Sequence, residues 1–137
     1  TTRRIRGITR RFLGYAARGV PHGPDDGTLA PWAVVASLPF APEIVLPTLE
    51  HYSKTYPNME NEYGLVCSIN PTFKTRHSGQ SGWISKDHFA LDQGPVILMI
   101  ENYRSGLIWR LMRSCSYVVA GLRCAGFTGS WLTRVPS

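Results

Sequence analysis

Carboxylates next to glycine, proline and aromatic residues are the groups in this sequence whose types and spacing could do chemistry. They occur in four short segments, which are Asp25-Asp26-Gly27-Thr28, Pro42-Glu43, Asp92-Gln93-Gly94-Pro95 and Glu101-Asn102-Tyr103-Arg104. Hydrolysis of a glycosidic bond needs two carboxyl groups, one protonated as the acid and one ionised as the base or nucleophile. The sequence therefore contains the residue types that acid–base cleavage of a sugar requires.

Each of these carboxylates also has an ordinary structural explanation. The pair Asp25-Asp26 is typical of turns. Glu43 and Asp92 suit the first turns of helices, because a carboxylate there offsets unpaired N–H groups and the helix dipole. Glu101 and Arg104 are three residues apart, and this spacing predicts a helical ion pair. The residue types alone leave both explanations open.

The spacing along the chain limits which carboxylates could work as a pair. On one helix Asp92 and Glu101 would lie roughly 13 Å apart along the axis. Glycosidases place their two carboxyl groups about 5–5.5 Å apart for retention or about 6.5–9.5 Å apart for inversion. A working pair must therefore combine different segments, including segments outside this sequence. Flat faces that could stack on a sugar, or equally pack in a core, belong to Trp32, Trp83, Tyr103 and Trp109.

The elements that must position these residues are helices joined by long irregular loops. Apolar spacing and helix-end signals predict helices at about 32–38, 42–56, 92–112 and 115–125. Pro47 is expected to distort the second helix, and Gly126 to end the last. The loops at 19–31 and 57–90 carry a turn at Asp26-Gly27 and a short extended segment at 63–69.

The helix that follows Asp92 is the clearest of these elements. Asp92 is expected to be its N-cap, Pro95 to lie in the first turn, and Gly106 to bend or split it. Its residues from Val96 to Met112 are apolar nearly all round, unlike the single stripe of a surface helix. Three or four helices are too few to surround such a helix. We therefore expect part of its core to lie outside this sequence and the chain to fold poorly alone.

The net charge of +6 is confined to one end of the chain. Residues 1–18 contain six arginines and no acid, whereas the other 119 residues carry nine basic and nine acidic groups. A basic arm could hold phosphate backbones, but no nucleic-acid motif follows it, so no nucleic-acid partner is expected. The longest aliphatic run is Val96–Ile100, which is too short for a membrane span.

The cysteines and the N-terminus add little chemistry. Cys67, Cys115 and Cys124 cannot all pair, and none is in a Cys-x-x-Cys arrangement, so we expect three core thiols and no metal ion. Thr1 is not a start methionine, and no secretory signal segment is present. The sequence therefore reads as a processed chain or as a piece of a longer one.

Three segments together resemble the glucoamylase-like domain family, which includes bacterial endo-β-1,2-glucanases and a domain of cyclic β-1,2-glucan synthases. They are Pro-Asp-Asp-Gly-Thr-Leu-Ala-Pro (24–31), Leu-Pro-Phe-Ala-Pro-Glu-Ile-Val-Leu-Pro (38–47) and Leu-Asp-Gln-Gly-Pro-Val-Ile-Leu-Met-Ile-Glu-Asn-Tyr-Arg-Ser-Gly-Leu-Ile-Trp (91–109). The resemblance runs from about residue 14 to residue 131. It implies an all-α fold, the C-terminal portion of an (α/α)6 toroid with long irregular loops.

The resemblance also implies a function and a set of site residues. It implies a glycoside hydrolase acting on a β-glucan of the β-1,2 type, without a cofactor, in the periplasm or secreted. Catalytic candidates are Asp92 first, then Asp26 and Glu101. Candidates for substrate binding are Asp25, Trp32, Glu43, Tyr103 and Arg104. The acid partner and the rest of the cleft would belong to the N-terminal part of the same domain, so this portion alone is expected to be inactive.

The start of the chain departs from the family pattern. Residues 9–15 read Thr-Arg-Arg-Phe-Leu-Gly-Tyr where the family has an Asp-Gly loop before Gly-Tyr. We therefore divide the chain into a basic N-terminal segment, 1–18, whose relation to the domain the sequence leaves open, and the C-terminal toroid portion, 19–137. Two alternatives stay open: a non-catalytic, carbohydrate-binding or truncated remnant of the same scaffold, and a basic-armed interaction protein.

Overall fold

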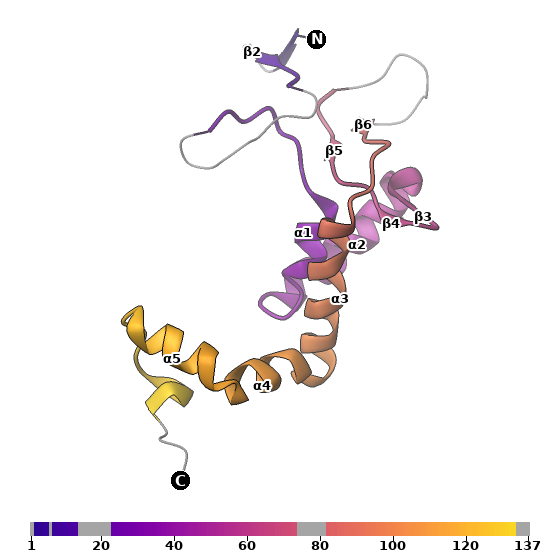
Figure 1. The fold of residues 1–137 in the computed structure, drawn as a ribbon. Coiled ribbons are helices and arrows are strands. Elements are labelled where there is room, and N and C mark those ends of the chain that lie inside the picture. Colours follow the sequence, from indigo (N-terminus) through magenta and orange to yellow (C-terminus); the bar gives the residue numbers. More distant parts are fainter. Residues whose placement is uncertain (1, 6, 14–22, 74–81, 134–137) are drawn as a thin grey trace.

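The computed structural model describes residues 2–5, 7–13, 23–73 and 82–133. Five α-helices supply most of its regular structure, and short strands flank them at one end (Figure 1). In order, the helices are α1 (Pro31–Ala36), α2 (Pro42–Thr55), α3 (Ala90–Ser105), α4 (Leu107–Ser114) and α5 (Ser116–Cys124), with 3-10 turns η1 (Pro57–Met59) and η2 (Ser130–Thr133). The four predicted helices are therefore present, the third as two pieces.

Prolines open the first two helices. Pro31 and Pro42 each occupy the first turn, where the missing N–H is not needed for the helical ladder. Pro47 lies inside α2 and removes one N–H from its ladder, yet the helix continues to Thr55. The backbone N–H of Tyr56 donates to the carbonyl oxygen of Tyr52 at 2.7 Å and closes the last turn.

The start of α3 differs from the prediction. The helix begins at Ala90, with Phe89 as its N-cap residue, so Asp92 is not the cap and lies within the first turn. Pro95 consequently lies in the helix interior and not in its first turn. Ala90 and Leu91 favour helix, and packing against α1 stabilises this additional half-turn, which a local cap signal does not report.

Gly106 divides the long apolar segment, as predicted. Its φ of 67° is in the left-handed region that favours glycine, so it ends α3 and starts α4 in a new direction. The last helix, α5, is followed by Gly126 with a φ of 82°, which agrees with the predicted C-terminal stop. In Figure 1, α4 and α5 extend away from the bundle of α1, α2 and α3.

The described strands form three separate two-stranded antiparallel sheets. The pairs are β1 (Thr2–Ile5) with β2 (Ile8–Arg11), β3 (Glu60–Asn61) with β4 (Gly64–Leu65), and β5 (Ile69–Asn70) with β6 (Trp83–Ile84). Arg3 is opposite Arg10 in the first pair, so arginines of the N-terminal segment lie on both strands of one hairpin. Ile69 pairs with Ile84 in the last one and also bridges to Leu29.

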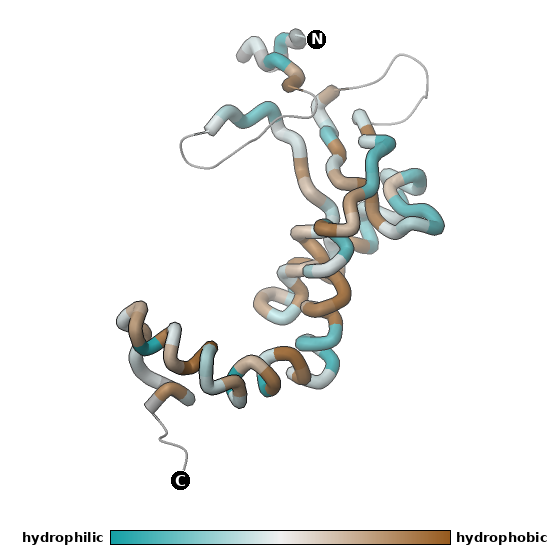
Figure 2. Tube along the Cα trace, viewed as in Figure 1, coloured by the Kyte–Doolittle hydropathy of each residue, from teal (hydrophilic) through white to brown (hydrophobic). Residues whose placement is uncertain are grey.

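The buried core is small and lies between α2 and the strands that follow it. Its buried members are Tyr52, Tyr56, Met59, Val66 and Ile69. The apolar residues of α3, by contrast, continue round the helix (Figure 2), and many of them are exposed: Leu91 by 84% and Ile97 by 67%. This agrees with the expectation that the residues present cannot surround this helix.

The three cysteines are free thiols but are not three core residues. Cys67 is buried, Cys115 is half-buried and Cys124 is exposed on α5. The expectation of three core thiols is therefore wrong for Cys124. It is the last residue of α5, a helix in which no described residue is buried.

Candidate active site

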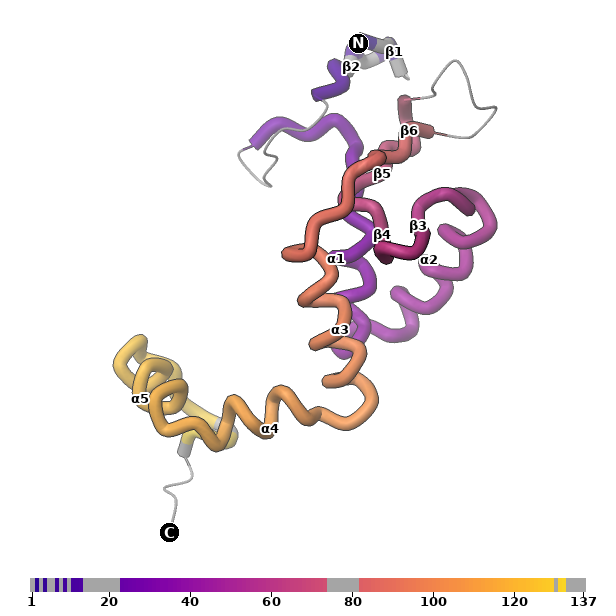
Figure 3. The backbone as a smooth tube through the Cα atoms, turned by 45° about the vertical axis from the view of Figure 1, so that its right-hand side comes forward, coloured from indigo at the N-terminus to yellow at the C-terminus, as the bar shows by residue number. Residues whose placement is uncertain are grey.

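The predicted site residues of the first and third segments lie at one end of the fold. The loop at 23–30 leads into α1, and Asp92 lies in the first turn of α3. Helices α1 and α3 make the most extensive contact between any two elements and begin at the same end, as the views in Figure 1 and Figure 3 agree. The parallel packing of these two helices therefore brings both segments to one end.

Asp92 is the buried carboxylate of this end. It is 9% exposed, and within the described part of the chain its carboxylate has no hydrogen bond or ion pair. Burial raises the pKa of Asp92 above the ordinary 3.8, because removal from water disfavours the charged form. A carboxyl group that retains its proton more readily is suited to general acid chemistry or to hydrogen bonding with a sugar hydroxyl.

Asp26 is also buried, but its carboxylate is fully engaged. At 1% exposure, Oδ1 accepts from the Thr28 hydroxyl at 2.6 Å and from the Thr28 backbone N–H at 3.1 Å. Oδ2 accepts from the backbone N–H of Leu13 at 3.0 Å. These bonds arrange Asp26 as the centre of a folded loop, which is the turn explanation given by the sequence, with Gly27 at a φ of 79°.

Asn70 joins this loop to the next strand pair. Its Nδ2 donates to the Asp26 carbonyl oxygen at 3.1 Å and to the Thr28 Oγ1 at 2.9 Å. Its Oδ1 accepts from the Thr72 backbone N–H at 2.9 Å and from the Thr72 hydroxyl at 2.6 Å. Asn70 is not among the site residues predicted from the sequence. The available signal was an Asn-Pro pair directly after the apolar run that ends at Ile69.

The remaining candidates of this end are more open to solvent. Asp25 is exposed, and its Oδ1 accepts from the Gly27 backbone N–H at 2.8 Å. Trp32 is half-buried on α1. Glu43 is exposed in the first turn of α2, as its helix-start explanation predicts. Because α2 runs antiparallel to α1, its first turn lies away from the end that carries Asp92 (Figure 3).

The candidates of the Glu101 segment lie at the other end of α3. The Glu101 carboxylate accepts a short hydrogen bond from the Ser105 hydroxyl, and its Oε2 is 3.8 Å from the Arg104 Nη1. The predicted helical ion pair is thus present. Tyr103 is 48% exposed beside it. The fold therefore separates Glu101, Tyr103 and Arg104 from Asp92 by roughly 13 Å or more of helix.

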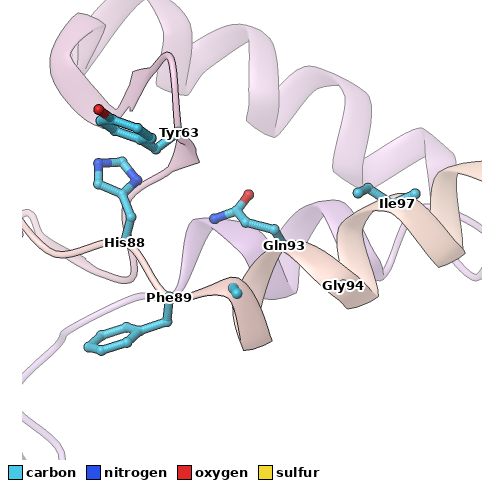
Figure 4. A pocket seen from close by; sticks show the side chains of 7 residues that line it. Tyr63, His88, Phe89, Gln93, Gly94 and Ile97 are labelled. Carbon is cyan, nitrogen blue, oxygen red and sulfur yellow. The ribbon is translucent and has the colours of Figure 1, made fainter.

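An open hollow of about 670 Å³ lies beside the first turns of α3 (Figure 4). Its lining residues are Tyr63, His88, Phe89, Ala90, Gln93, Gly94 and Ile97, and Asp92 is not among them. The Nδ1 of His88 lies 3.1 Å from the Leu65 carbonyl oxygen, and its Nε2 lies 3.1 Å from the Asn61 Nδ2. Both ring nitrogens of His88 therefore contact polar groups of β3 and β4.

Metal and membrane sites find no support in the described part of the chain. No group of three or more His, Cys, Asp or Glu residues in it could hold a metal ion. None of the helices in residues 2–133 that the structure describes has the length and hydropathy needed to cross a bilayer.

Comparison with known proteins gives consistent likenesses. The family model described as "Putative glucoamylase" matches residues 2–116. An exo β-1,2-glucooligosaccharide sophorohydrolase of Parabacteroides distasonis is 34% identical over 109 residues, which are 79% of this chain but 14% of the relative. The chain thus spans about one seventh of the length of that curated relative.

Two solved β-1,2-glucanases have a similar fold. The endo-β-1,2-glucanase of Chitinophaga pinensis, solved with sophorotriose and glucose, is 31% identical with a TM-score of 0.69, over 90% of this chain and 28% of that one. A β-1,2-glucanase of Parabacteroides distasonis is 30% identical with a TM-score of 0.61, over 90% and 16%. These likenesses confirm the all-α prediction of a portion of an (α/α)6 toroid.

Proposed function

Because this chain belongs to the glucoamylase-like family, whose similar members are β-1,2-glucan hydrolases, we propose that it is part of a domain that hydrolyses β-1,2-glucan. The domain would cleave the glycosidic bond by acid–base catalysis between carboxyl groups, with an oligo- or polysaccharide as substrate. We propose that the domain acts in the periplasm or outside the cell, where it would encounter a polysaccharide substrate. No cofactor enters this chemistry.

The observation that carries the proposal is the buried, unpaired carboxyl group of Asp92. Asp92 is 9% exposed at the start of α3, and burial raises the pKa of its carboxyl, which is an environment typical of functional carboxyl groups. In the proposed mechanism Asp92 contacts the reacting bond in one of two ways. Protonated, it would give its proton to the leaving-group oxygen as the glycosidic C–O bond breaks; ionised, it would accept a proton from the water that attacks the sugar carbon. Asp25 would hydrogen-bond sugar hydroxyls, and the half-buried Trp32 would present an apolar face to a ring.

The second carboxyl group is proposed to come from helices outside these 137 residues. Among the described residues of the Asp92 end, Asp26 is occupied by three hydrogen bonds and Asp25 is a solvent-exposed turn residue. Exposed apolar residues on α3, such as Leu91 and Ile97, offer a surface on which further helices of the same domain would pack. Glu101 and Arg104 would then serve the architecture of the far end and not the reaction.

The test is an assay of sugar release by the longest native polypeptide that contains this chain. We expect it to release products from β-1,2-glucan, and Asp92→Asn to lower turnover by at least about 100-fold, as loss of an acid–base group does. Glu50→Gln is the control, because Glu50 is an exposed carboxylate paired only with Lys54. Equal loss of activity and of folding in Asp92→Asn would contradict the catalytic role.

A second candidate is a saccharide-binding remnant that does not hydrolyse. In the described residues, Asp26 is bonded within its loop and Glu101 lies at the far end of α3. Asp92 therefore has no described carboxylate with which it could form a catalytic pair, and this favours the remnant. Binding of sophorotriose without release of reducing ends, in the longest native polypeptide, would favour this candidate over the hydrolase.

A further inference from the structure

Asn70 is the most connected polar residue of the end that carries Asp92. It is 0% exposed, and its side-chain amide makes four hydrogen bonds, two from the nitrogen and two to the oxygen. A primary amide has two donor hydrogens and two acceptor lone pairs, so its capacity is filled. Few buried amides reach this state without their position being tightly fixed.

The partners of Asn70 come from two segments that are far apart in the sequence. Asp26 and Thr28 precede it by more than forty residues, whereas Thr72 lies two residues after it. The Thr72 hydroxyl also lies 3.3 Å from the Asp26 carbonyl oxygen. One amide therefore sets the distance between the loop before α1 and the turn after β5.

Backbone pairing next to the amide reinforces the same junction. The Leu29 N–H donates to the Ile69 carbonyl at 2.7 Å, and the Ile69 N–H donates to the Leu29 carbonyl at 2.9 Å. Gly82, on the other side, is buried so closely that a Cβ there would lie 2.7 Å from the Asn70 carbonyl oxygen. The backbone of Ile69 and Asn70, which carries the amide, is thus held from two sides.

We propose that Asn70 is a positioning residue that fixes the Asp25-Asp26 turn, and through it the exposed Asp25 carboxylate, for contact with the saccharide. Only the contact between Asp25 and the saccharide rests on the proposed function. Asn70 does not touch the substrate in this scheme. It holds the carbonyl of Asp26, one peptide unit from Asp25, so that a short turn tethered at Gly27 presents its carboxylate in one orientation.

The first arm of the test is amide hydrogen exchange in the longest native polypeptide that contains this chain. In Asn70→Ala we expect exchange at Thr28, Leu29 and Thr72 to quicken by about tenfold, the scale of one or two lost buried hydrogen bonds. The amide of Tyr56, which closes α2, should keep its rate. The control is Asn58→Ala, an exposed asparagine on η1. Uniform acceleration throughout the chain, or none at the turn, would overturn the proposal.

The second arm is a double-mutant cycle on the affinity for sophorotriose, with Asp25→Ala, Asn70→Ala and the double variant. A positioning role predicts that the double variant loses no more affinity than Asp25→Ala alone, whereas a general structural role predicts multiplied losses. Multiplied losses overturn the proposal. If the unmodified chain and the longest native polypeptide both fail to bind sophorotriose, the proposed function fails, and the exchange arm alone then decides whether Asn70 fixes the turn.

Discussion

The side chain of Asn102 accepts a hydrogen bond from the backbone N–H of Trp109 at 3.0 Å, across the corner between α3 and α4. Asn102 is 4% exposed, so the last turn of one helix supplies the cap for the first turn of the next. The Ser105 Oγ accepts from the Leu107 N–H at 3.2 Å in the same corner. Polar residues of the segment that most resembles the family therefore build a change of direction.

Replacing Asn102 by alanine should lower the free energy of unfolding by about 1–3 kcal/mol, because the Trp109 N–H loses its partner in a buried position. Chemical denaturation measured by circular dichroism would give the value. Ser114→Ala, which removes an exposed hydroxyl bonded to a helical carbonyl, should change it by less than about 0.5 kcal/mol. Equal effects of the two variants would contradict the capping role.

Replacing Gly106 by alanine should destabilise the corner between α3 and α4 because of backbone strain at a positive φ, and not because of a steric clash. A Cβ there would meet only the Arg110 Nη1 at 3.5 Å, an ordinary contact, but the φ of 67° costs an L-residue about 1–2 kcal/mol. Gly121→Ala is the matched control inside α5, where a Cβ meets nothing within 4 Å. That variant should gain about 0.5–1 kcal/mol, so thermal melts should shift in opposite directions.

The pH dependence of stability should carry the signature of Asp92. Its folded-state pKa is raised by burial, so the folded chain binds the proton more tightly than the unfolded chain does. This contribution is fully present below the unfolded pKa, near 3.8, and is lost as the pH rises through the higher folded pKa.

Asp92→Asn should abolish that fall in stability, because asparagine has no proton to lose. Unfolding free energies of the variant and the unmodified chain, measured from pH 3 to pH 7 (roughly the range in which carboxyl groups titrate), should diverge in favour of the variant as the pH rises. A constant difference across the range would show that Asp92 does not titrate differently in the two states.

Two large aliphatic residues should differ sharply in their importance to this chain. Ile69 is fully buried in the core, so Ile69→Ala should cost about 2–5 kcal/mol. Leu91 is 84% exposed on α3, so Leu91→Ala should change stability by less than about 0.5 kcal/mol. In the longest native polypeptide, however, Leu91→Ala should become destabilising if further helices pack on α3. Melting curves of both variants in both contexts would test this.

The sequence by itself determined the helices and their ends where the signals are local. Pro31 and Pro42 open helices because their missing N–H is not needed there, and Gly106 and Gly126 end them because a positive φ suits glycine. The turn at Gly27 and the Glu101–Arg104 ion pair follow from the same short-range rules. The continuous apolar character of α3 likewise predicted its many exposed residues.

Only the tertiary structure decided which carboxylates are buried and which groups they bind. Asp26 and Asp92 are both acidic residues within two positions of a glycine, yet one accepts hydrogen bonds from Leu13 and Thr28 and the other has no described partner. Asn70 gained its role from a loop more than forty residues away. Hydrogen bonding and desolvation depend on distances through space, and residue order alone does not contain those distances.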